Sequence, residues 1–301
     1  MPDLPPAREV EPLSAADSIR GLSARFREAG LDTPELDARV LVLQAAELSH
    51  EAYVLDPQWA LPAEAARRVE DFAARRLARE PVSRIIGSRE FWGRSFAVDA
   101  STLDPRPDTE TLIEAVLAAV DEDGGRERPL RLLDLGTGTG CILLTLLAEL
   151  PPAWGVGIDI SQEALAVARR NAQAHGLSSR AAFCCGDWAA TISGMFHYIL
   201  SNPPYIRSED IAALDPEVRY YDPRRALDGG ADGFAAYRRI AQEALALAAP
   251  GAWLALEAGA GQMRQLHDLL VNTGWQSDCS SCRVYPDLSG QDRVVVVRKQ
   301  Q

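Results

Sequence analysis

The chain has 301 residues, of which 47% are hydrophobic. That is enough apolar material for one large domain with a smaller partner domain. The formal net charge is −12 and the sequence pI is about 4.9. Proteins that bind nucleic acid usually carry a basic surface, because neutralising phosphates supplies most of their non-specific affinity. The acidic balance therefore disfavours a nucleic-acid substrate and favours a protein partner with a basic surface.

The chain also lacks the sequence features of membrane and secreted proteins. It contains no run of about 18 apolar residues, so we expect no transmembrane helix. The opening segment MPDLPPAREVEP has neither the charged start nor the apolar centre of a secretory signal. We therefore expect a cytoplasmic protein.

The cysteines and histidines do not have the spacing of a metal site. Five cysteines are an odd number, which argues against a disulfide framework in a chain of this size. Cys279 and Cys282 have the C-x-x-C spacing of half a zinc or redox site, but no second pair and no histidine lies near them. The four histidines likewise lack ligand spacing. We interpret these cysteines as isolated thiols and expect no metal.

The first part of the chain is predicted to be a small helical bundle. Ser14 and Thr33 stand where N-caps of two helices are expected, and Pro62 opens a third. Apolar residues recur there at helical spacing, and no strand-like alternation appears. Arg75 and Arg76 are expected to face solvent. Such a bundle would suit a module that recognises the substrate.

Strand-like segments dominate the remainder of the chain. Short β-prone runs broken by Gly87 and Gly93 predict a hairpin. Strand-like and helical segments then alternate, which is typical of a parallel sheet covered by helices on both faces. We therefore expect a helical recognition domain at 1–85, a linking hairpin at 86–104 and an α/β domain at 105–301. The strand-like runs are RLLDL, GVGID, AAFCC, HYILS, WLALEA and RVVVVR.

A glycine-rich loop follows the first of these strands. Gly136, Gly138 and Gly140 stand between the strand and a helix, where glycines let the backbone approach a ligand closely. A nicotinamide-binding loop has the pattern G-x-G-x-x-G, but its third glycine would here be Cys141. Asp134 precedes the loop, and an acid there suits a cationic cofactor better than a pyrophosphate. The loop therefore favours S-adenosylmethionine, which carries a sulfonium and an ammonium.

Acidic residues also follow the next two strands. Asp159 ends the second strand, about 19 residues after the last glycine, where a carboxylate can accept hydrogen bonds from ribose hydroxyls. Asp187 and Trp188 follow the third strand, where an adenine could be sandwiched and its amino group bound. The ligand crevice of an open α/β sheet lies at the carboxyl ends of its strands. These residues should therefore converge on one cofactor.

The fourth strand leads into Asn202-Pro203-Pro204-Tyr205, which we predict binds the methyl acceptor. The Asn202 side-chain carbonyl and the Pro203 main-chain carbonyl can accept hydrogen bonds from an NH₂ group. They would aim the nitrogen lone pair at the methyl group and stabilise the positive charge that builds on nitrogen. Two prolines make the segment rigid, and Tyr205 offers a flat face to a planar acceptor. Because the methyl group is carried on a sulfonium, which leaves as a neutral thioether, orientation alone can supply roughly 7–11 kcal/mol of catalysis without a strong base.

Several strings taken together resemble the HemK/PrmC family, the glutamine N5-methyltransferases that modify peptide chain release factors. The likeness runs from about residue 15 to residue 298. Its most specific part is the Pro-Arg-Pro-x-Thr-Glu string at 105–110. The sister family that methylates a ribosomal-protein glutamine lacks this string, whereas Asn-Pro-Pro-Tyr alone also occurs in adenine methyltransferases.

The resemblance implies a Rossmann-like class I methyltransferase domain with a mixed, mostly parallel seven-stranded sheet. It also implies S-adenosylmethionine as cofactor and, as substrate, the glutamine of the Gly-Gly-Gln loop of class 1 release factors. Asn202, Pro203, Pro204 and Tyr205 would hold the glutamine, with Asn202, Pro203 and Tyr205 taking part in catalysis, while the N-terminal helices would grip the release factor. The cofactor-binding residues would be Gly136, Thr137, Gly138, Thr139, Gly140, Asp159, Asp187, Trp188 and Asn202.

Several alternatives remain open at the level of the sequence. The substrate could be a ribosomal-protein glutamine or a nucleic-acid adenine, and a non-catalytic module that retains the cofactor pocket is a third possibility. Arg106 and Glu110 could start a helix, with Glu110 as its cap, or belong to a lid over the cofactor. Glu257 ends a strand and could pack against the Asn202 loop. We expect a monomer, because no long apolar seam is left exposed.

Overall fold

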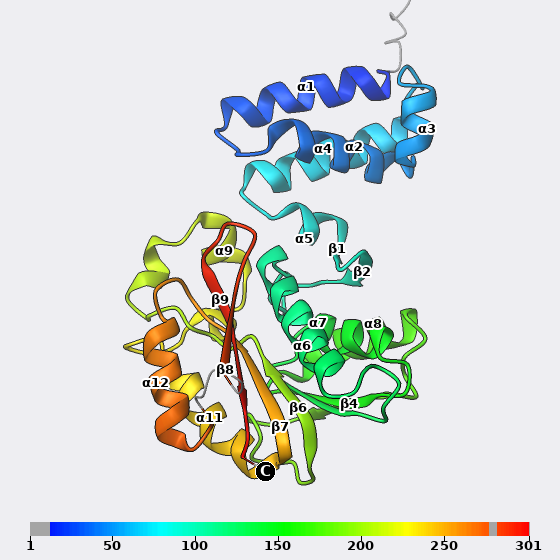
Figure 1. Cartoon of the computed structure of the whole chain (residues 1–301). Coiled ribbons are helices and arrows are strands. Elements are labelled where there is room, and N and C mark those ends of the chain that lie inside the picture. Colours follow the sequence, from blue (N-terminus) through cyan, green and yellow to red (C-terminus); the bar gives the residue numbers. More distant parts are fainter. Residues whose placement is uncertain (1–12, 277–281, 301) are drawn as a thin grey trace, which may run out of the picture. The chain divides into compact units, whose positions relative to one another are not determined.

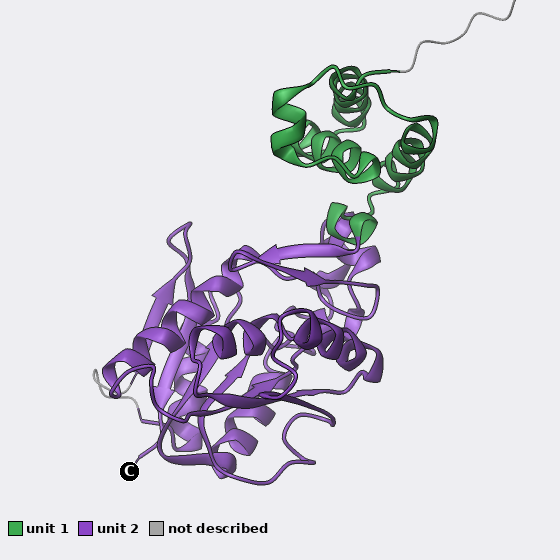
Figure 2. Cartoon of the chain, turned by 90° about the vertical axis from the view of Figure 1, so that its right-hand side faces the viewer, with its two compact units in different colours: residues 1–86 green, residues 87–301 purple. Residues whose placement is uncertain are grey.

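The structure, a computed structural model, describes residues 13–276 and 282–300. It separates into two compact units, Met1–Ile86 and Gly87–Gln301, which Figure 2 shows in different colours. Cys279 lies outside the described residues, so the interpretation of the C-x-x-C pair stays a prediction.

Unit 1 is built from helices around a small apolar core that includes Phe26 and Leu41. Ser14 caps the first helix as expected, because its hydroxyl oxygen accepts a hydrogen bond from the Asp17 backbone N–H. A short helix capped by Ser49 in the same way was not predicted. The helices are α1 (Ala15–Glu28), α2 (Pro34–Ala46), α3 (His50–Leu55), α4 (Ala63–Leu77) and α5 (Val82–Ile86).

The prediction that Arg76 faces solvent is wrong. Its side chain is only 4% exposed, and its Nε donates a hydrogen bond to Asp37 Oδ2 at 2.7 Å. Arg76 follows Val69 and Ala73 on the buried stripe of α4 at helical spacing, so the helix carries it inward. Asp37 then neutralises the buried charge. Arg75 beside it is half-buried rather than fully exposed.

Unit 2 begins with the expected β-hairpin, in which β1 (Ser88–Phe91) pairs antiparallel with β2 (Arg94–Ala97). Trp92 and Gly93 form its two-residue turn with φ angles of 53° and 65°. Paired positive φ angles suit a hairpin turn because they match the twist of the flanking strands. The buried Asn171 amide exchanges two hydrogen bonds with the β2 backbone and so anchors the hairpin to the rest of unit 2.

The rest of unit 2 is organised around a seven-stranded sheet in the order β5-β4-β3-β6-β7-β9-β8. Neighbouring strands from β5 to β7 are parallel, whereas β9 runs antiparallel to both β7 and β8. The mixed, mostly parallel seven-stranded sheet is thereby confirmed, although β8 was not among the predicted runs. The strands are β3 (Arg131–Leu135), β4 (Trp154–Asp159), β5 (Ala181–Cys185), β6 (Phe196–Ser201), β7 (Ala248–Glu257), β8 (Cys282–Pro286) and β9 (Asp292–Arg298).

Helices cover both faces of this sheet (Figure 1). Successive residues of a strand point to opposite faces, so Leu132 joins one apolar cluster and Leu133 the other. This explains why the central strands read as continuous apolar runs. One face carries α6 (Glu110–Glu122), α7 (Cys141–Glu149) and α8 (Gln162–Ala174), and the other carries α11 (Ala235–Leu247) and α12 (Met263–Thr273).

Short elements connect the sheet to its helices near the carboxyl ends of the strands. They are the 3₁₀ turns η1 (Pro107–Thr109) and η2 (Asp210–Ala213) and the helices α9 (Pro216–Tyr221) and α10 (Arg224–Leu227). Because β3, β4, β5 and β6 are parallel neighbours, the segments that follow them all emerge at one edge of the sheet. That edge holds the predicted site.

None of the helices in residues 13–276 and 282–300 combines the length and the apolar character needed to cross a membrane. Within the same residues, no group of three or more His, Cys, Asp or Glu side chains is arranged to hold a metal ion.

The buried Asp37–Arg76 pair gives the first testable prediction. Replacing Arg76 with methionine should lower the free energy of unfolding of unit 1 by about 3–5 kcal/mol, because Asp37 is left as a buried charge without its partner. The control is Arg68→Met, since Arg68 pairs with Glu47 on the surface. Urea unfolding followed by far-ultraviolet circular dichroism would measure both. Equal stability of the two variants would contradict a structural role for the buried pair.

Candidate active site

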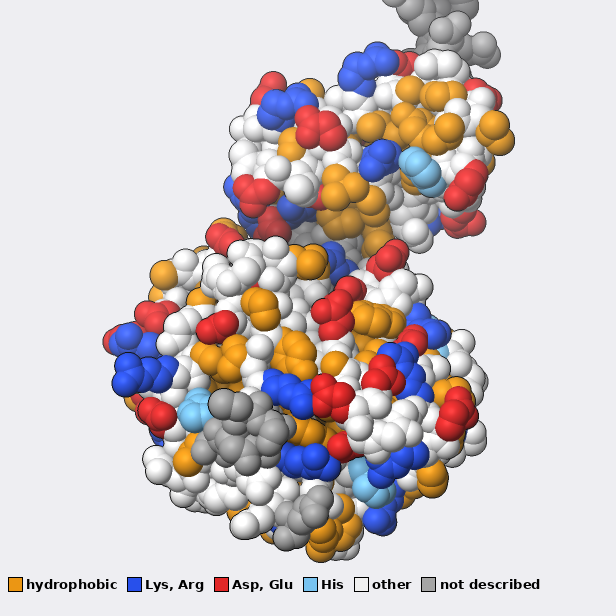
Figure 3. Space-filling view, in the orientation of Figure 1, with side chains coloured by type: hydrophobic (Ala, Val, Ile, Leu, Met, Phe, Trp, Pro, Cys, Tyr) orange, Lys and Arg blue, Asp and Glu red, His pale blue; other side chains and the backbone are white. Residues whose placement is uncertain are grey.

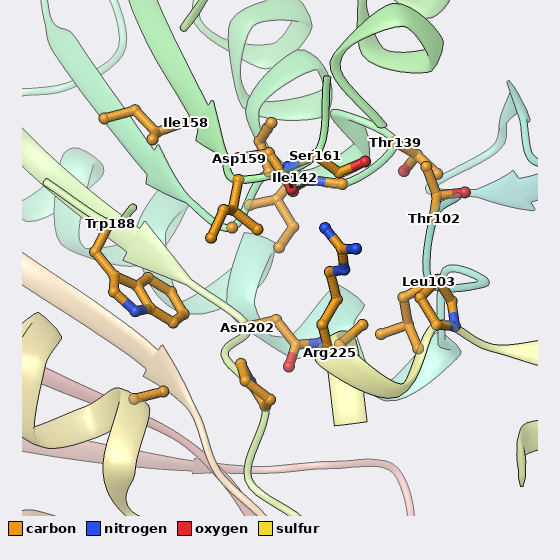
Figure 4. A pocket seen from close by; sticks show the side chains of 18 of the residues that line it. Thr102, Leu103, Thr139, Ile142, Ile158, Asp159, Ser161, Trp188, Asn202 and Arg225 are labelled. Atoms are coloured by element: carbon orange, nitrogen blue, oxygen red, sulfur yellow. Dashed lines mark hydrogen bonds between the residues drawn. The ribbon is translucent and has the colours of Figure 1, made fainter. Parts of the chain in front are cut away.

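A cavity of about 520 Å³ opens at the carboxyl ends of β3 to β6 (Figure 4). Most of the predicted cofactor residues line it, although they come from four separate strand ends. These residues are Gly136, Thr137, Gly138, Thr139, Asp159, Asp187, Trp188 and Asn202. A volume of this size lies within the range of about 300–1,000 Å³ that is usual for small-molecule sites.

The glycine loop lies against the neighbouring strand through its backbone. The N–H groups of Gly136 and Thr137 both donate to the Ile158 carbonyl, at 2.8 and 2.9 Å. Gly138 has a φ of 54°, and a Cβ atom there would enter open space. Because the loop needs this left-handed conformation and leaves that space free, a ligand can lie directly on its backbone.

Gly140 has a different position from the other loop glycines. It does not line the cavity but serves as the N-cap residue of α7, with a φ of 79°. A Cβ atom there would stand 3.1 Å from a Leu144 methyl carbon and 3.3 Å from the Ala168 Cβ. The structure therefore places Gly140 where α7 packs closely against its neighbours, outside the proposed cofactor surface.

Asp134 is buried behind the loop rather than exposed in the cavity. Its Oδ2 accepts a hydrogen bond from the Thr137 hydroxyl at 2.6 Å, so it orients the loop from behind. Its Oδ1 has no hydrogen-bond partner among the described residues. Burial, together with the nearby charge of Asp159, raises the pKa of Asp134 to about 7, although the hydrogen bond from Thr137 lowers it. A cationic ligand in the cavity would favour the ionised form.

Asp159 lies at the end of β4 on the edge of the cavity. Its Oδ2 accepts from the Gly138 N–H and its Oδ1 from the Ser161 N–H, both at 2.9 Å. These contacts fix the carboxylate in place and leave each oxygen with further accepting capacity. The side chain can therefore still accept hydrogen bonds from a ribose diol.

Asp187 and Trp188 follow β5, the strand next to β4, and also line the first cavity. Asp187 is exposed and pairs with Arg239 at 2.6 Å. Trp188 has a φ of 55°, and its ring lies so close to the loop that a Cβ atom on Gly136 would stand 3.6 Å from it. In Figure 4 this ring faces the space in front of Asp159 and Asn202. A flat aromatic surface at this point fits an adenine.

A second cavity, of about 310 Å³, lies on the other side of Asn202. Pro203 and Tyr205 line it, whereas Pro204 lines the first cavity. Asn202 and Arg106 line both cavities. The Asn-Pro-Pro-Tyr segment thus separates two compartments, and Asn202 is exposed to each of them.

A chain of hydrogen bonds through Thr109 to Glu257 holds the Asn202 amide. Asn202 Nδ2 donates to Thr109 Oγ1 at 3.0 Å, and the Thr109 hydroxyl donates to Glu257 Oε2 at 2.7 Å. Thr109 is 2% exposed and Glu257 1% exposed. Because the amide nitrogen is bound here, the Asn202 carbonyl oxygen is the part of the amide that is left for a ligand.

Tyr205 and Glu257 both have pKa values raised chiefly by burial. The Glu257 pKa rises to about 7, although hydrogen bonds from Thr109 and Asn202 and the charge of Arg293 lower it. The Tyr205 pKa rises to about 12, with the Glu257 charge adding to the effect of burial. Tyr205 is therefore neutral near pH 7 and presents an apolar ring.

The structure tests one of the two interpretations of Arg106 and Glu110, the helix start, whereas a lid over the cofactor stays a prediction. Glu110 begins α6 behind the turn η1, but its side chain accepts a hydrogen bond from the Trp92 backbone N–H rather than capping its own helix. Arg106 donates to the buried carboxylate of Asp222 at 2.5 Å. That ion pair connects the segment before η1 with the segment between α9 and α10, and its Arg106 side lines both cavities.

These residues fit S-adenosylmethionine. The open space in front of Gly138 leaves room on the loop, and Asp159 supplies acceptors for a ribose. Trp188 supplies a flat wall, while the acids Asp134 and Asp159 make the loop side of the cavity suitable for a cation.

Comparison with known proteins agrees with this assignment. A family model described as "PrmC N-terminal domain" matches residues 17–87, and one described as "Methyltransferase domain" matches residues 127–266. Among solved structures, a methyltransferase from Pyrococcus furiosus matches with a TM-score of 0.50 and 14% identity, over 79% of this chain and 100% of that one, which supports the fold. The protein is a class I methyltransferase that uses S-adenosylmethionine.

Two curated relatives identify the family. The release factor glutamine methyltransferase of Rhodospirillum rubrum is 50% identical over 275 residues, covering 91% of this chain and 82% of that protein. The protein of the same name from Cereibacter sphaeroides is 46% identical over 286 residues, covering 95% and 99%. The chain belongs to the release factor glutamine methyltransferase family.

Three residues at the site were not assigned a role from the sequence. Thr109 belongs to the Pro-Arg-Pro-x-Thr-Glu string, but its contact with Asn202 joins positions 93 residues apart in the chain. Arg225 on α10 reaches into the first cavity toward Ser161 (Figure 4), and Asp222 holds Arg106. The surrounding sequence has the composition of an ordinary polar loop, so only the string around Thr109 offered a signal.

Asp159 gives the prediction for the cofactor site. The Asp159→Ala variant should bind S-adenosylmethionine roughly 10- to 100-fold more weakly, because it loses charged hydrogen bonds to the ligand and the support of the Gly138 N–H. Isothermal titration calorimetry would measure the dissociation constant. Asp232→Ala is the matched control, since Asp232 pairs with Arg238 outside the cavity. An affinity within about twofold of wild type for Asp159→Ala would exclude the assigned role.

Proposed function

We propose that this enzyme transfers a methyl group from S-adenosylmethionine to the side-chain amide nitrogen of the glutamine in the Gly-Gly-Gln motif of class 1 release factors. The observation that carries the proposal is the position of Asn202 between the two cavities. One cavity fits the cofactor, and the other is a smaller compartment next to it. The names of the curated relatives support a release-factor glutamine as the occupant of the second.

Asn202 has the chemistry that an amide acceptor requires. Its nitrogen is bound to Thr109, so its carbonyl oxygen is available to accept a hydrogen bond from the substrate NH₂. We propose that the Pro203 main-chain carbonyl accepts from the second N–H. Two acceptors on the two N–H groups direct the nitrogen lone pair out of the amide plane and stabilise the charge that develops on nitrogen.

The reaction needs orientation rather than a strong base. Bound S-adenosylmethionine supplies an electrophilic methyl group on a sulfonium. The substrate nitrogen gains the methyl group and releases one proton to solvent. Tyr205, with its pKa raised to about 12, stays protonated and provides a flat wall for the amide. Holding the reactants in line can supply roughly 7–11 kcal/mol.

A protein substrate fits the charge of the chain better than a nucleic acid does. The formal net charge is −12. On the face of unit 2 drawn in Figure 3, Lys and Arg side chains lie among Asp and Glu side chains. Nucleic-acid binding would be served by a continuous basic area. We further propose that the N-terminal helices grip the release factor and that the enzyme works as a monomer in the cytoplasm.

Substitution of Asn202 tests the proposal. The Asn202→Ala variant should lower kcat by roughly 10²- to 10³-fold, because it removes an acceptor that acts as charge develops on nitrogen. The assay is transfer from labelled S-adenosylmethionine to a purified unmethylated release factor, followed by peptide mass mapping of the Gly-Gly-Gln segment. Asn272→Ala on the exposed side of α12 is the matched control.

Two outcomes would overturn the proposal. Near-full activity of Asn202→Ala would remove Asn202 from the mechanism. Methylation by the wild-type protein at a residue other than that glutamine, or of nucleic acid instead of protein, would change the substrate while the methyltransferase assignment stays.

A further inference from the structure

A buried carboxyl group, that of Glu257, stands close to Asn202 at the boundary of the second cavity. Asn202 follows the end of β6 and Glu257 ends β7, and these strands are parallel neighbours with Ser201 opposite Leu256. Thr109, at the end of the turn η1, lies between the two side chains. The three groups form a chain of hydrogen bonds, and the proposed reaction has so far used only the contact between Thr109 and Asn202.

The direction of these hydrogen bonds decides which end of the Asn202 amide faces the cavities. An ionised carboxylate can only accept hydrogen bonds, so the Thr109 hydroxyl donates its one hydrogen to Glu257. Its oxygen can then only accept, and the group that it accepts from is Asn202 Nδ2. The Asn202 carbonyl oxygen must consequently point the other way.

The orientation of the Asn202 amide has to be fixed by its neighbours because the two ends of an asparagine amide have nearly the same shape. A rotation of 180° exchanges the oxygen and the NH₂ group with almost no change in packing. In the rotated state Asn202 would offer donors to a substrate NH₂ group, which needs acceptors. The hydrogen-bonding groups behind Asn202 must therefore hold the productive orientation.

We propose that Thr109 and Glu257 are positioning residues for methyl transfer, which fix the Asn202 amide with its carbonyl oxygen toward the substrate nitrogen. The proposal rests on the proposed function, because it assumes that an NH₂ group is the acceptor. It extends that function by naming a source of acceptor specificity: the site selects a planar NH₂ group and rejects a hydrogen-bond acceptor at the same place.

The ionisation of Glu257 makes the orientation of the Asn202 amide depend on pH. A protonated Glu257 can donate to Thr109, which frees the Thr109 hydrogen for the Asn202 oxygen and permits the rotated state. Since burial raises the Glu257 pKa to about 7, the productive orientation is favoured above that pH and lost below it. The titratable and charged groups that act on Glu257 are Asp108, Cys141, Tyr205, Tyr237 and Arg293.

Three threonine substitutions test the proposal. Thr109→Val keeps the shape but removes the hydroxyl group, so kcat on the release factor should fall roughly 10- to 100-fold, with KM changed little. Thr109→Ser restores the hydroxyl group and should stay within about threefold of wild type. Thr145→Val is the control, because Thr145 is equally buried and its hydroxyl has no partner among the described residues. Thermal melting and the affinity for S-adenosylmethionine would show that each variant is folded.

A Glu257→Gln variant tests the pH dependence. A glutamine side chain does not titrate, so the kcat of this variant should vary by less than about twofold between pH 6 and 8. Wild-type kcat should rise by about tenfold over the same interval, as expected for a group with a pKa near 7. Any titration of Asp134 is common to both proteins and cancels in the comparison.

The outcomes separate this inference from the proposed function. If the wild-type protein does not methylate the glutamine, the proposed function fails. If it does, and Thr109→Val has wild-type kcat or Glu257→Gln shows the wild-type pH profile, the positioning role alone is overturned.

Discussion

The architecture of the site depends on one constraint, which is that four parallel strands end at the same edge of the sheet. β3 contributes the glycine loop, β4 contributes Asp159, β5 is followed by Trp188 and β6 by Asn202. These segments are far apart in the sequence, and the sheet is what brings them together. The continuous apolar faces of the strands, covered by helices on both sides, hold the strands in that arrangement.

Two buried carboxyl groups support the residues at this edge through hydrogen bonds. Asp134 supports the glycine loop through Thr137, and Glu257 supports Asn202 through Thr109. Burial raises the pKa of each to about 7, so the fold keeps both acids where their charge is costly. Buried ionisable groups with strongly shifted pKa values are typical of functional sites, where the orientation of the reacting groups is kept at some expense of fold stability. In this enzyme they orient the groups that touch the ligands.

Much of this could be predicted from local sequence, and the failures have physical reasons. The central strands and the loop at Gly136 were visible because apolar runs and turn glycines are local signals. The strand β8 was missed because its burial is partial and its sequence is mixed. The prediction for Arg76 was wrong because charged residues usually lie on the surface. Its helical spacing from the apolar residues of α4 placed it on the buried side of that helix. The contact between Thr109 and Asn202 spans 93 residues, so no local pattern reports it.

The most direct test of the account is a crystal structure of the enzyme with S-adenosylhomocysteine and a peptide that contains Gly-Gly-Gln. We expect the cofactor product along the loop at Gly138, and the glutamine side chain in the second cavity with its nitrogen in hydrogen-bond contact with Asn202 Oδ1. The hydrogen bonds from Asn202 to Thr109 and from Thr109 to Glu257 should be retained. A glutamine bound elsewhere, or an Asn202 amide that turns its nitrogen toward the substrate, would contradict the account.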